Sequence, residues 1–284
     1  MIHETCLVNH VGTRGSGTPG NEVFSEQTSR VVFFGISTLL FVCSAALTAA
    51  WCRTMGAMGG MPMPGGWTMS MMWMPGQRWI IAGVSFVGMW MVMMVAMMLP
   101  SLSPSLWRYY ESLGKKPCRG RSTLLVGLGY FFSWTVPGLA IYPIGKAAAA
   151  LAMKQPGLMG AVPWAGGVVV LLAGTLQFTS WKADQLTRCR QVLDGGSLVP
   201  ANAGAALGLG FRSGLYCILS CCNLTVILLV VGVMDLRAMI AVTAGITGER
   251  LAPSGDRVAR AVGSVVVGLA IYLCLSAFRS CLRV

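Results

Sequence analysis

Much of the sulfur in this sequence lies where it has no evident core to fill. Of the 19 methionines, eight lie between Met55 and Met74, in a stretch rich in glycine and proline. Glycine and proline interrupt regular structure, whereas methionine ordinarily fills gaps in a packed core. Thioether sulfur is a soft ligand that selects Cu(I) over hard cations. We therefore expect the loop 52–78 to contact a soft metal. The candidate ligands in this loop are Met58, Met61, Met63 and Met69. The alternatives are that residues 67–73 anchor the loop at a membrane interface, or that the loop has no specific role.

A second group of six methionines lies within one apolar segment, from Met89 to Met98. Met89, Met93 and Met97 are spaced four residues apart, so a helix places them on one face. Met94 and Met98 form a second row beside them. These thioethers would supply a ladder of soft metal ligands. The alternative is that they are ordinary apolar filling of a membrane helix.

Three of the ten cysteines lie close together in the segment YCILSCCNL. Cys217 and Cys221 are four residues apart and share a helix face, whereas Cys222 is rotated by about 100° from Cys221. Two such thiolates can hold Cu(I) or zinc together with a third ligand from a neighbouring helix. The alternatives are that these cysteines act as small buried hydrophobes or as a thiol redox group.

The elements that position this sulfur are predicted to be membrane helices. Hydrophobic residues make up 55% of the 284-residue chain and charged residues only 11%, where soluble domains carry roughly 25% charged residues. Several apolar runs reach about 20 residues, the length that crosses a bilayer as a helix. The predicted fold class is all-α, a polytopic transmembrane helical bundle with about six to seven spans.

The bundle is expected to form a single membrane domain over residues 31–284, after a polar and disordered tail at 1–30 without a cleavable signal peptide. The sixth span is short enough to fail to cross fully, and the Ala- and Gly-rich segment 200–212 is a candidate extension of the fifth. The predicted spans cover residues 31–51, 79–100, 122–145, 161–181, 213–233, 236–250 and 260–279.

The methionines of the second span and the cysteines of the fifth span are expected at similar depths in the membrane. At about 1.5 Å per residue, Met93 and Cys221 are expected at similar depths in the second and fifth spans. If those two spans pack together, the ladder of Met89, Met93 and Met97 leads to Cys217 and Cys221. Sulfur on both helices at one level suits a linear or trigonal Cu(I) site.

The net charge of +12 is explained by membrane topology. With the N-terminus in the cytoplasm, fourteen lysines and arginines fall on the cytoplasmic side and seven on the other. This bias follows the positive-inside rule and places the loop 52–78 outside the cytoplasm. No basic stripe lies beside a stacking aromatic platform, so no nucleic-acid partner is expected. The expected partners are the lipid bilayer, a soft metal ion and a partner membrane protein.

Polar side chains near the ends of the spans are further candidates. Gln177, Lys182, Asp235 and Glu249 lie there, and an ionisable residue buried in a membrane is a functional hypothesis by default. The alternatives are snorkelling to the interface or a local ion pair, such as Glu249 with the neighbourhood of Arg250. The sequence contains no catalytic motif, and its two histidines lie in the tail. We therefore do not expect an enzyme.

Four sequence blocks resemble the DUF2182 family of bacterial integral membrane proteins, which are described as predicted metal-binding proteins. The blocks are MPMPGGWTMSMMWMPGQRW, FVGMWMVMMVAMMLPSLSPSLWRY, LQFTSWKADQLTRCR and VVGVMDLRAMIAVTAGITGERLAP. The resemblance covers about residues 50–265. Positions that match the family pattern are Trp90, Met94, Met97, Met98, Pro100, Gln177, Lys182, Cys189 and Glu249. Members also carry a cysteine cluster near 217–222, although its spacing varies.

Taken together, the sequence predicts a multi-pass protein of the bacterial inner membrane that binds and handles a soft metal, with copper as the expected ion. Delivery to an assembling enzyme and passage across the bilayer are both compatible with this prediction. The alternatives are a membrane thiol- or quinone-linked redox enzyme that uses the cysteines of 217–222, and a non-catalytic assembly partner with no site of its own.

Overall fold

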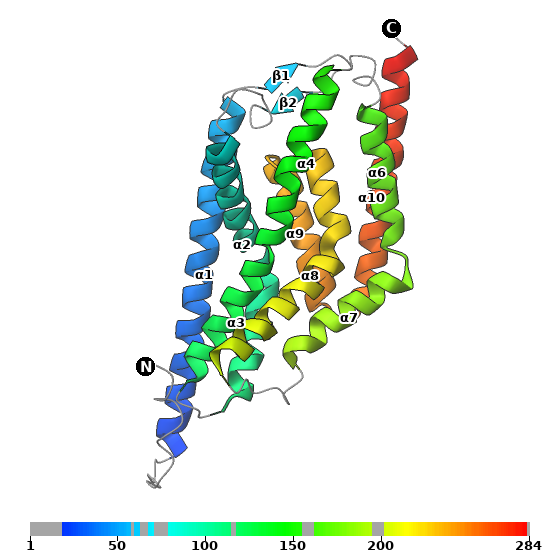
Figure 1. Cartoon of the computed structure of the whole chain (residues 1–284). Coiled ribbons are helices and arrows are strands. Elements are labelled where there is room, and N and C mark those ends of the chain that lie inside the picture. Colours follow the sequence, from blue (N-terminus) through cyan, green and yellow to red (C-terminus); the bar gives the residue numbers. More distant parts are fainter. Residues whose placement is uncertain are drawn as a thin grey trace.

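The computed structural model describes residues 19–57, 60–62, 68–70, 79–114, 118–154, 162–194 and 202–282. This part of the chain is a bundle of long helices with one short two-stranded ribbon at one end (Figure 1). The predicted all-α membrane bundle is therefore confirmed. The first half of the chain contains α1 (Pro19–Ala57), β1 (Gly60–Pro62), β2 (Thr68–Ser70), α2 (Trp79–Ser112), α3 (Arg119–Ser133) and α4 (Thr135–Lys154). The second half contains α6 (Val162–Leu176), α7 (Ser180–Asp194), α8 (Ala203–Val231), α9 (Leu236–Leu251) and α10 (Gly255–Leu282).

Length and apolarity identify the helices that can cross a membrane. Within the described ranges, five helical segments meet both criteria, and a sixth span results if the bent pair α6 and α7 is counted as one. The five segments are Glu26–Thr54, Trp79–Ser112, Arg119–Leu151, Ala203–Val231 and Gly255–Leu275. Large apolar side chains are exposed along their outer faces, as at Val31, Ile80 and Val265. Exposed apolar surface of this extent is typical of contact with lipid rather than with water.

Some predicted boundaries differ from those in the structure. Helix α1 begins at Pro19, so residues 19–30 are helical rather than part of a disordered tail. Proline is tolerated in the first turn of a helix, because the N–H that it lacks has no partner there. The fifth span is longer than residues 213–233, because α8 begins at Ala203, where the Asn202 side chain accepts a hydrogen bond from Ala205 N at 2.8 Å. The Ala- and Gly-rich segment does extend the fifth helix.

The predicted span 161–181 is not a single straight helix. Helix α6 ends at Leu176, and α7 begins at Ser180 at an angle of 67° to it. At the break, the Thr179 hydroxyl donates to Leu176 O at 2.7 Å and accepts from Lys182 N at 3.4 Å, so side-chain bonds replace part of the helical ladder. Because of this bend, α7 runs obliquely inward from the end of α6 (Figure 1), and Lys182 and Cys189 on it are buried.

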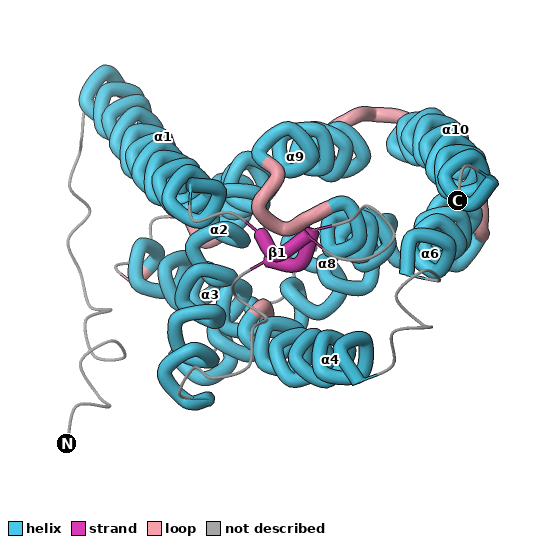
Figure 2. The backbone as a smooth tube through the Cα atoms, turned by 90° about the horizontal axis from the view of Figure 1, so that it is seen from above, coloured by secondary structure: helices cyan, strands magenta, loops and turns pink. Residues whose placement is uncertain are grey.

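Helices α3 and α8 pack with their backbones close together. A Cβ atom added at Gly129 would lie 3.0 Å from Phe211 N, and one added at Gly214 would lie 2.7 Å from Tyr130 O. Small residues at such contacts let membrane helices approach closely. Seen along the bundle axis, α1 and α10 lie at opposite sides of the molecule, with α2, α3 and α8 between them (Figure 2).

The strands β1 and β2 form an antiparallel ribbon in the Met-rich loop. Gly60 pairs with Ser70, Met61 with Met69 and Pro62 with Thr68. The ribbon lies at the end of the bundle where α1 finishes and α2 begins (Figure 1), which we call the ribbon end. The glycines and prolines of the loop thus do not prevent a short β-pairing, and they leave Met61 and Met69 opposite each other in the register.

Candidate metal centre

A thiol and a thioether meet in the middle of the bundle. Cys217 Sγ, on α8, lies 3.9 Å from Met98 Sδ, on α2, and both side chains are 0% exposed. A metal–thiolate bond is about 2.3 Å long, so two sulfurs on one trigonal metal are about 4.0 Å apart. The separation of this pair therefore matches two corners of a trigonal sulfur site.

Two more thiols surround Cys217. The Cys189 side chain, from α7, is buried and lies close enough to the Cys217 side chain to interact with it electrostatically. Cys221 interacts with the Cys217 thiol and donates to Cys217 O at 2.8 Å. We call Met98, Cys189, Cys217 and Cys221 the sulfur cluster. In the part of the chain that the structure describes, no three His, Cys, Asp or Glu side chains are arranged to hold a metal by themselves. A metal with three sulfur ligands at Cys217 would therefore include the Met98 thioether.

A buried cation lies against the sulfur cluster. Arg250 Nη1, at the end of α9, donates to Ser101 Oγ at 2.9 Å, to Tyr130 OH at 3.1 Å and to Cys217 Sγ at 3.4 Å. The Tyr130 hydroxyl in turn donates to Cys217 Sγ at 2.9 Å. The guanidinium is buried, and a buried charge is costly unless an opposite charge compensates it. A metal-bound thiolate at Cys217 would supply that opposite charge.

An ion pair forms a second polar layer beside the cluster. Lys182 Nζ lies 2.8 Å from Glu249 Oε2, and Gln177 Nε2 donates to Glu249 Oε1 at 2.9 Å. Lys182 also donates to Ser220 O and, at 3.4 Å, to Asn223 Oδ1. Gln177, Lys182 and Glu249 are at most 3% exposed. A local pair of Glu249 with the neighbourhood of Arg250 was one alternative that the sequence left open, whereas the structure pairs Glu249, on α9, with Lys182, on α7.

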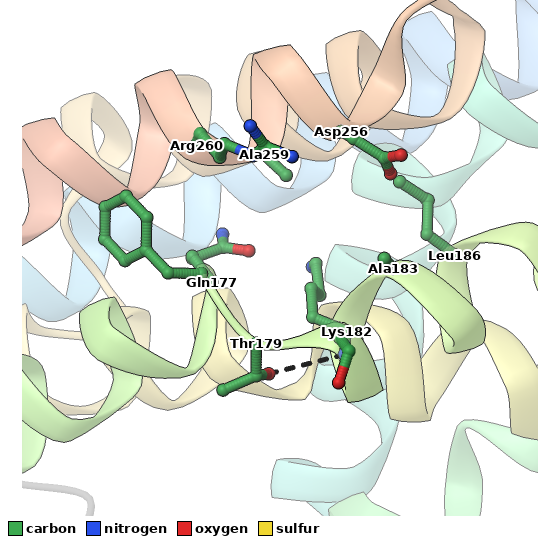
Figure 3. Close-up of a pocket in the computed structure, with 10 residues that line it drawn as sticks. Gln177, Thr179, Lys182, Ala183, Leu186, Asp256, Ala259 and Arg260 are labelled. Atoms are coloured by element: carbon green, nitrogen blue, oxygen red, sulfur yellow. Dashed lines mark hydrogen bonds between the residues drawn. The ribbon is translucent and has the colours of Figure 1, made fainter.

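A pocket of about 310 Å³ opens beside this layer, between the α6–α7 break and the start of α10. Figure 3 shows Gln177, Thr179 and Lys182 on one side of it, and Asp256 and Arg260, from α10, on the other. Asp256 and Arg260 are exposed at its mouth, whereas Gln177 and Lys182 are buried at its inner wall. The pocket therefore leads from the surface toward the Lys182–Glu249 pair.

The predicted ligands are only partly brought together. Met89, Met93 and Met97 are 5%, 1% and 2% exposed, so all three face the protein interior rather than lipid. The thioether in contact with Cys217 nevertheless belongs to Met98, in the neighbouring row. Cys217 and Cys221 are both in the sulfur cluster, whereas Cys222 lies outside it.

The remaining predicted residues lie elsewhere. Met58 and Met63 are outside the described residues, and Met61 and Met69 belong to the ribbon. Asp235 is the N-cap of α9, since Oδ1 accepts from Arg237 N at 2.8 Å and Ala238 N at 3.2 Å.

Sequence reasoning missed the residues that surround Cys217. Tyr130 and Ser101 gave no signal, because an isolated tyrosine or serine in an apolar span is common. Cys189 was noted only through the family resemblance, and Arg250 was counted as a cytoplasmic positive charge. A signal for Arg250 did exist in the adjacent Glu249–Arg250 pair, which places two charges together at the end of a span.

Fold and site together define a helical membrane protein with a buried cluster of soft ligands. A family model described as PpoB2, copper chaperone, matches residues 87–273, which include α2 from Val87 onward and α10 as far as Leu273. The chain therefore belongs to the PpoB2 copper chaperone family. The match agrees with the expectation of a copper-related membrane family. No curated protein and no solved structure matches the chain.

Proposed function

We propose that this membrane protein binds Cu(I) at the sulfur cluster and passes the ion toward the Met-rich loop 52–78, for delivery to an acceptor protein. The observation that carries the proposal is the contact of 3.9 Å between Cys217 Sγ and Met98 Sδ. The two sulfurs come from different helices and are fully buried, so they can hold an ion away from water. The family match supports copper as the cargo.

The chemistry around the cluster favours a soft, singly charged ion. Thiolate and thioether sulfur select Cu(I) over hard cations. The oxygen atoms of Glu249, the nearest buried carboxylate described above, already accept from Lys182 and Gln177. A Cu(I) ion held by the Cys217 and Cys189 thiolates would carry one net negative charge, which Arg250 would neutralise. The positive charge of the buried guanidinium and the negative charge of the copper-loaded site then compensate each other.

The methionines of α2 offer a route from the cluster to the ribbon end. From Met98 to Met89, the helix rises by about 14 Å. Met89, Met93, Met94 and Met97 are all buried along this length. Each turn of α2 therefore presents thioether sulfur to the interior, and an ion that moves along this face meets successive soft ligands instead of hydrocarbon.

The charge bias of the sequence supports the orientation that we propose. With α1 starting on the cytoplasmic side of a bacterial inner membrane, the ribbon end faces outward. The acceptor would be a copper-requiring protein of the membrane or the outer compartment. The protein itself would carry copper without catalysing a reaction.

Copper titration tests the proposal. Full-length protein in detergent, titrated anaerobically with Cu(I) against a chromophoric chelator, should bind the ion about tenfold or more weakly when Cys217→Ser or Met98→Leu removes a ligand. The variant Met91→Leu is the matched control, because it removes a half-buried thioether of the same helix outside the cluster. Equal affinity in wild type, Cys217→Ser and Met98→Leu would contradict the proposal.

Thiol–disulfide chemistry is a second candidate, which the interaction between the buried Cys189 and Cys217 side chains favours. The two proposals differ in what Met98 contributes. A thioether is needed for copper binding but not for disulfide exchange. If Met98→Leu leaves copper binding unchanged while the Cys189 and Cys217 thiols are lost on mild oxidation, the redox function would be the better account.

A further inference from the structure

A second thiol–thioether pair lies near the ribbon end. Cys52 Sγ, on α1, lies 3.9 Å from Met234 Sδ, in the turn between α8 and α9. Cys52 is buried at 8% exposure, and Met234 is half-buried. The sulfur separation is the same as that of Cys217 and Met98. The two residues are 182 positions apart in the chain, so tertiary packing rather than local sequence brings them together.

The packing of α1 against α2 fixes the level of this pair. The rings of Phe33 and Trp107 lie 5.3 Å apart, and the two helices are antiparallel neighbours. Cys52 lies 19 residues beyond Phe33, and the same distance back along α2 from Trp107 leads to Gly88. Counted at equal rise along both helices, Cys52 is expected at about the level of Gly88 and the buried Met89. On this count the pair lies toward the end of the methionine face.

The surroundings of the pair suit a soft ion. The carboxylate of Asp235, next to Met234, is engaged as the N-cap of α9. The turn that carries Met234 joins α8 to α9 close to the ribbon in the view along the axis (Figure 2), and both lie toward the ribbon end in Figure 1. The family match begins at residue 87, so Cys52 lies outside the matched range, whereas Met234 is within it.

We propose that Cys52 and Met234 form a second Cu(I) site, a relay between the sulfur cluster and the Met-rich loop. This inference rests on the proposed function. Binding of Cu(I) displaces the thiol proton of Cys52 to solvent and forms bonds to Cys52 Sγ and Met234 Sδ. Copper remains Cu(I), so the step needs no oxidant or reductant. If the pair lies at the level of Met89, it is about 14 Å from the level of Met98, the rise between Met98 and Met89 along α2.

Counting copper in matched cysteine variants tests the relay. Full-length protein in lipid nanodiscs is loaded with Cu(I) anaerobically, freed of loosely held metal with a weak chelator, and assayed for copper per protein. Cys52→Ser should retain one copper ion fewer than wild type. Cys43→Ser is the matched control, because Cys43 lies on the same helix but is exposed, and it should retain the wild-type number.

Two further variants separate the possible outcomes. Met234→Leu keeps size and hydrophobicity but removes sulfur, so it should also lose the relay ion. If Cys52→Ser does not fold, the copper content of Met234→Leu tests the relay site by itself. Cys217→Ser should lose a different ion, so the double variant with Cys52→Ser loses two. If Cys52→Ser and Met234→Leu both retain as many copper ions per protein as wild type, the relay is overturned, whatever the copper content of Cys217→Ser. Loss in those two variants with full retention in Cys217→Ser supports the relay and refutes the sulfur cluster as a copper site.

Discussion

Replacing Gly210 with alanine tests the helix contact that holds Tyr130 against Cys217. An added Cβ at Gly210 would lie 2.8 Å from the carbonyl carbon of Val126, and closer still to its oxygen. Carbon atoms in ordinary contact are about 3.5 Å apart, so α3 and α8 must separate by roughly 0.7 Å or more. The obstacle is backbone, which cannot turn aside as a flexible side chain would.

The expected change in the unfolding free energy of Gly210→Ala follows from two opposing effects. Overpacking of a close contact costs about 1–3 kcal/mol, whereas alanine in place of glycine favours a helix by up to about 1 kcal/mol. Gly208, on the same helix, has no atom within 4 Å of an added Cβ. Gly208→Ala therefore gains the propensity effect without the clash. The difference in unfolding free energy between the two variants isolates the clash and should be about 1–3 kcal/mol.

Unfolding of both purified variants in detergent measures this difference. The same samples can be titrated with Cu(I), and the affinity should fall in Gly210→Ala, because separation of the helices moves Tyr130 away from Cys217. Gly208→Ala should bind as wild type does. If Gly210→Ala is as stable as Gly208→Ala, the close α3–α8 contact is wrong, and the position of Tyr130 beside Cys217 loses its support.

Three further predictions test the ion pair, the topology and the loop. Lys182→Met should destabilise the protein by about 3–5 kcal/mol, because it leaves the buried Glu249 charge without its cation, whereas Lys154→Met at the exposed end of α4 should change stability by less than about 0.5 kcal/mol. Equal detergent unfolding of these two variants would argue against the pair. Reporter fusions after Gly76 and Lys116 should report opposite sides of the membrane, and a shared compartment would refute the topology. Leucine in place of the four loop methionines removes sulfur at nearly constant size and should lower Cu(I) binding; unchanged binding would leave membrane anchoring as the better account of the loop. The four positions are Met58, Met61, Met63 and Met69.

The helical architecture follows from the sequence because the bilayer imposes a simple length and hydropathy rule. Apolar runs of about 20 residues predict spans, and α2, α8 and α10 lie where those runs are. The break between Leu176 and Ser180 was not predictable in this way. It contains neither proline nor glycine, and its geometry depends on a threonine hydroxyl that bonds to backbone atoms of both helices.

The grouping of the sulfur residues on helix faces was predicted more accurately than the partner of each sulfur. Helical spacing correctly grouped Cys217 with Cys221 and showed two methionine rows on α2. It could not decide which row meets Cys217, because that depends on how α2 and α8 are rotated against their neighbours. The contact of Met234 with Cys52 depends on the packing of α1 beside the α8–α9 turn, which leaves no trace in local spacing.

The central claim is that Cu(I) is held by sulfur inside the bundle. X-ray absorption at the copper edge of the Cu(I)-loaded full-length protein tests it most directly, with Cys217→Ser beside the wild type. We predict a first shell of sulfur only, at about 2.3 Å, with fewer sulfur neighbours per copper or less copper retained in the variant. A first shell that contains nitrogen or oxygen, or an identical spectrum and copper content in Cys217→Ser, would contradict the claim.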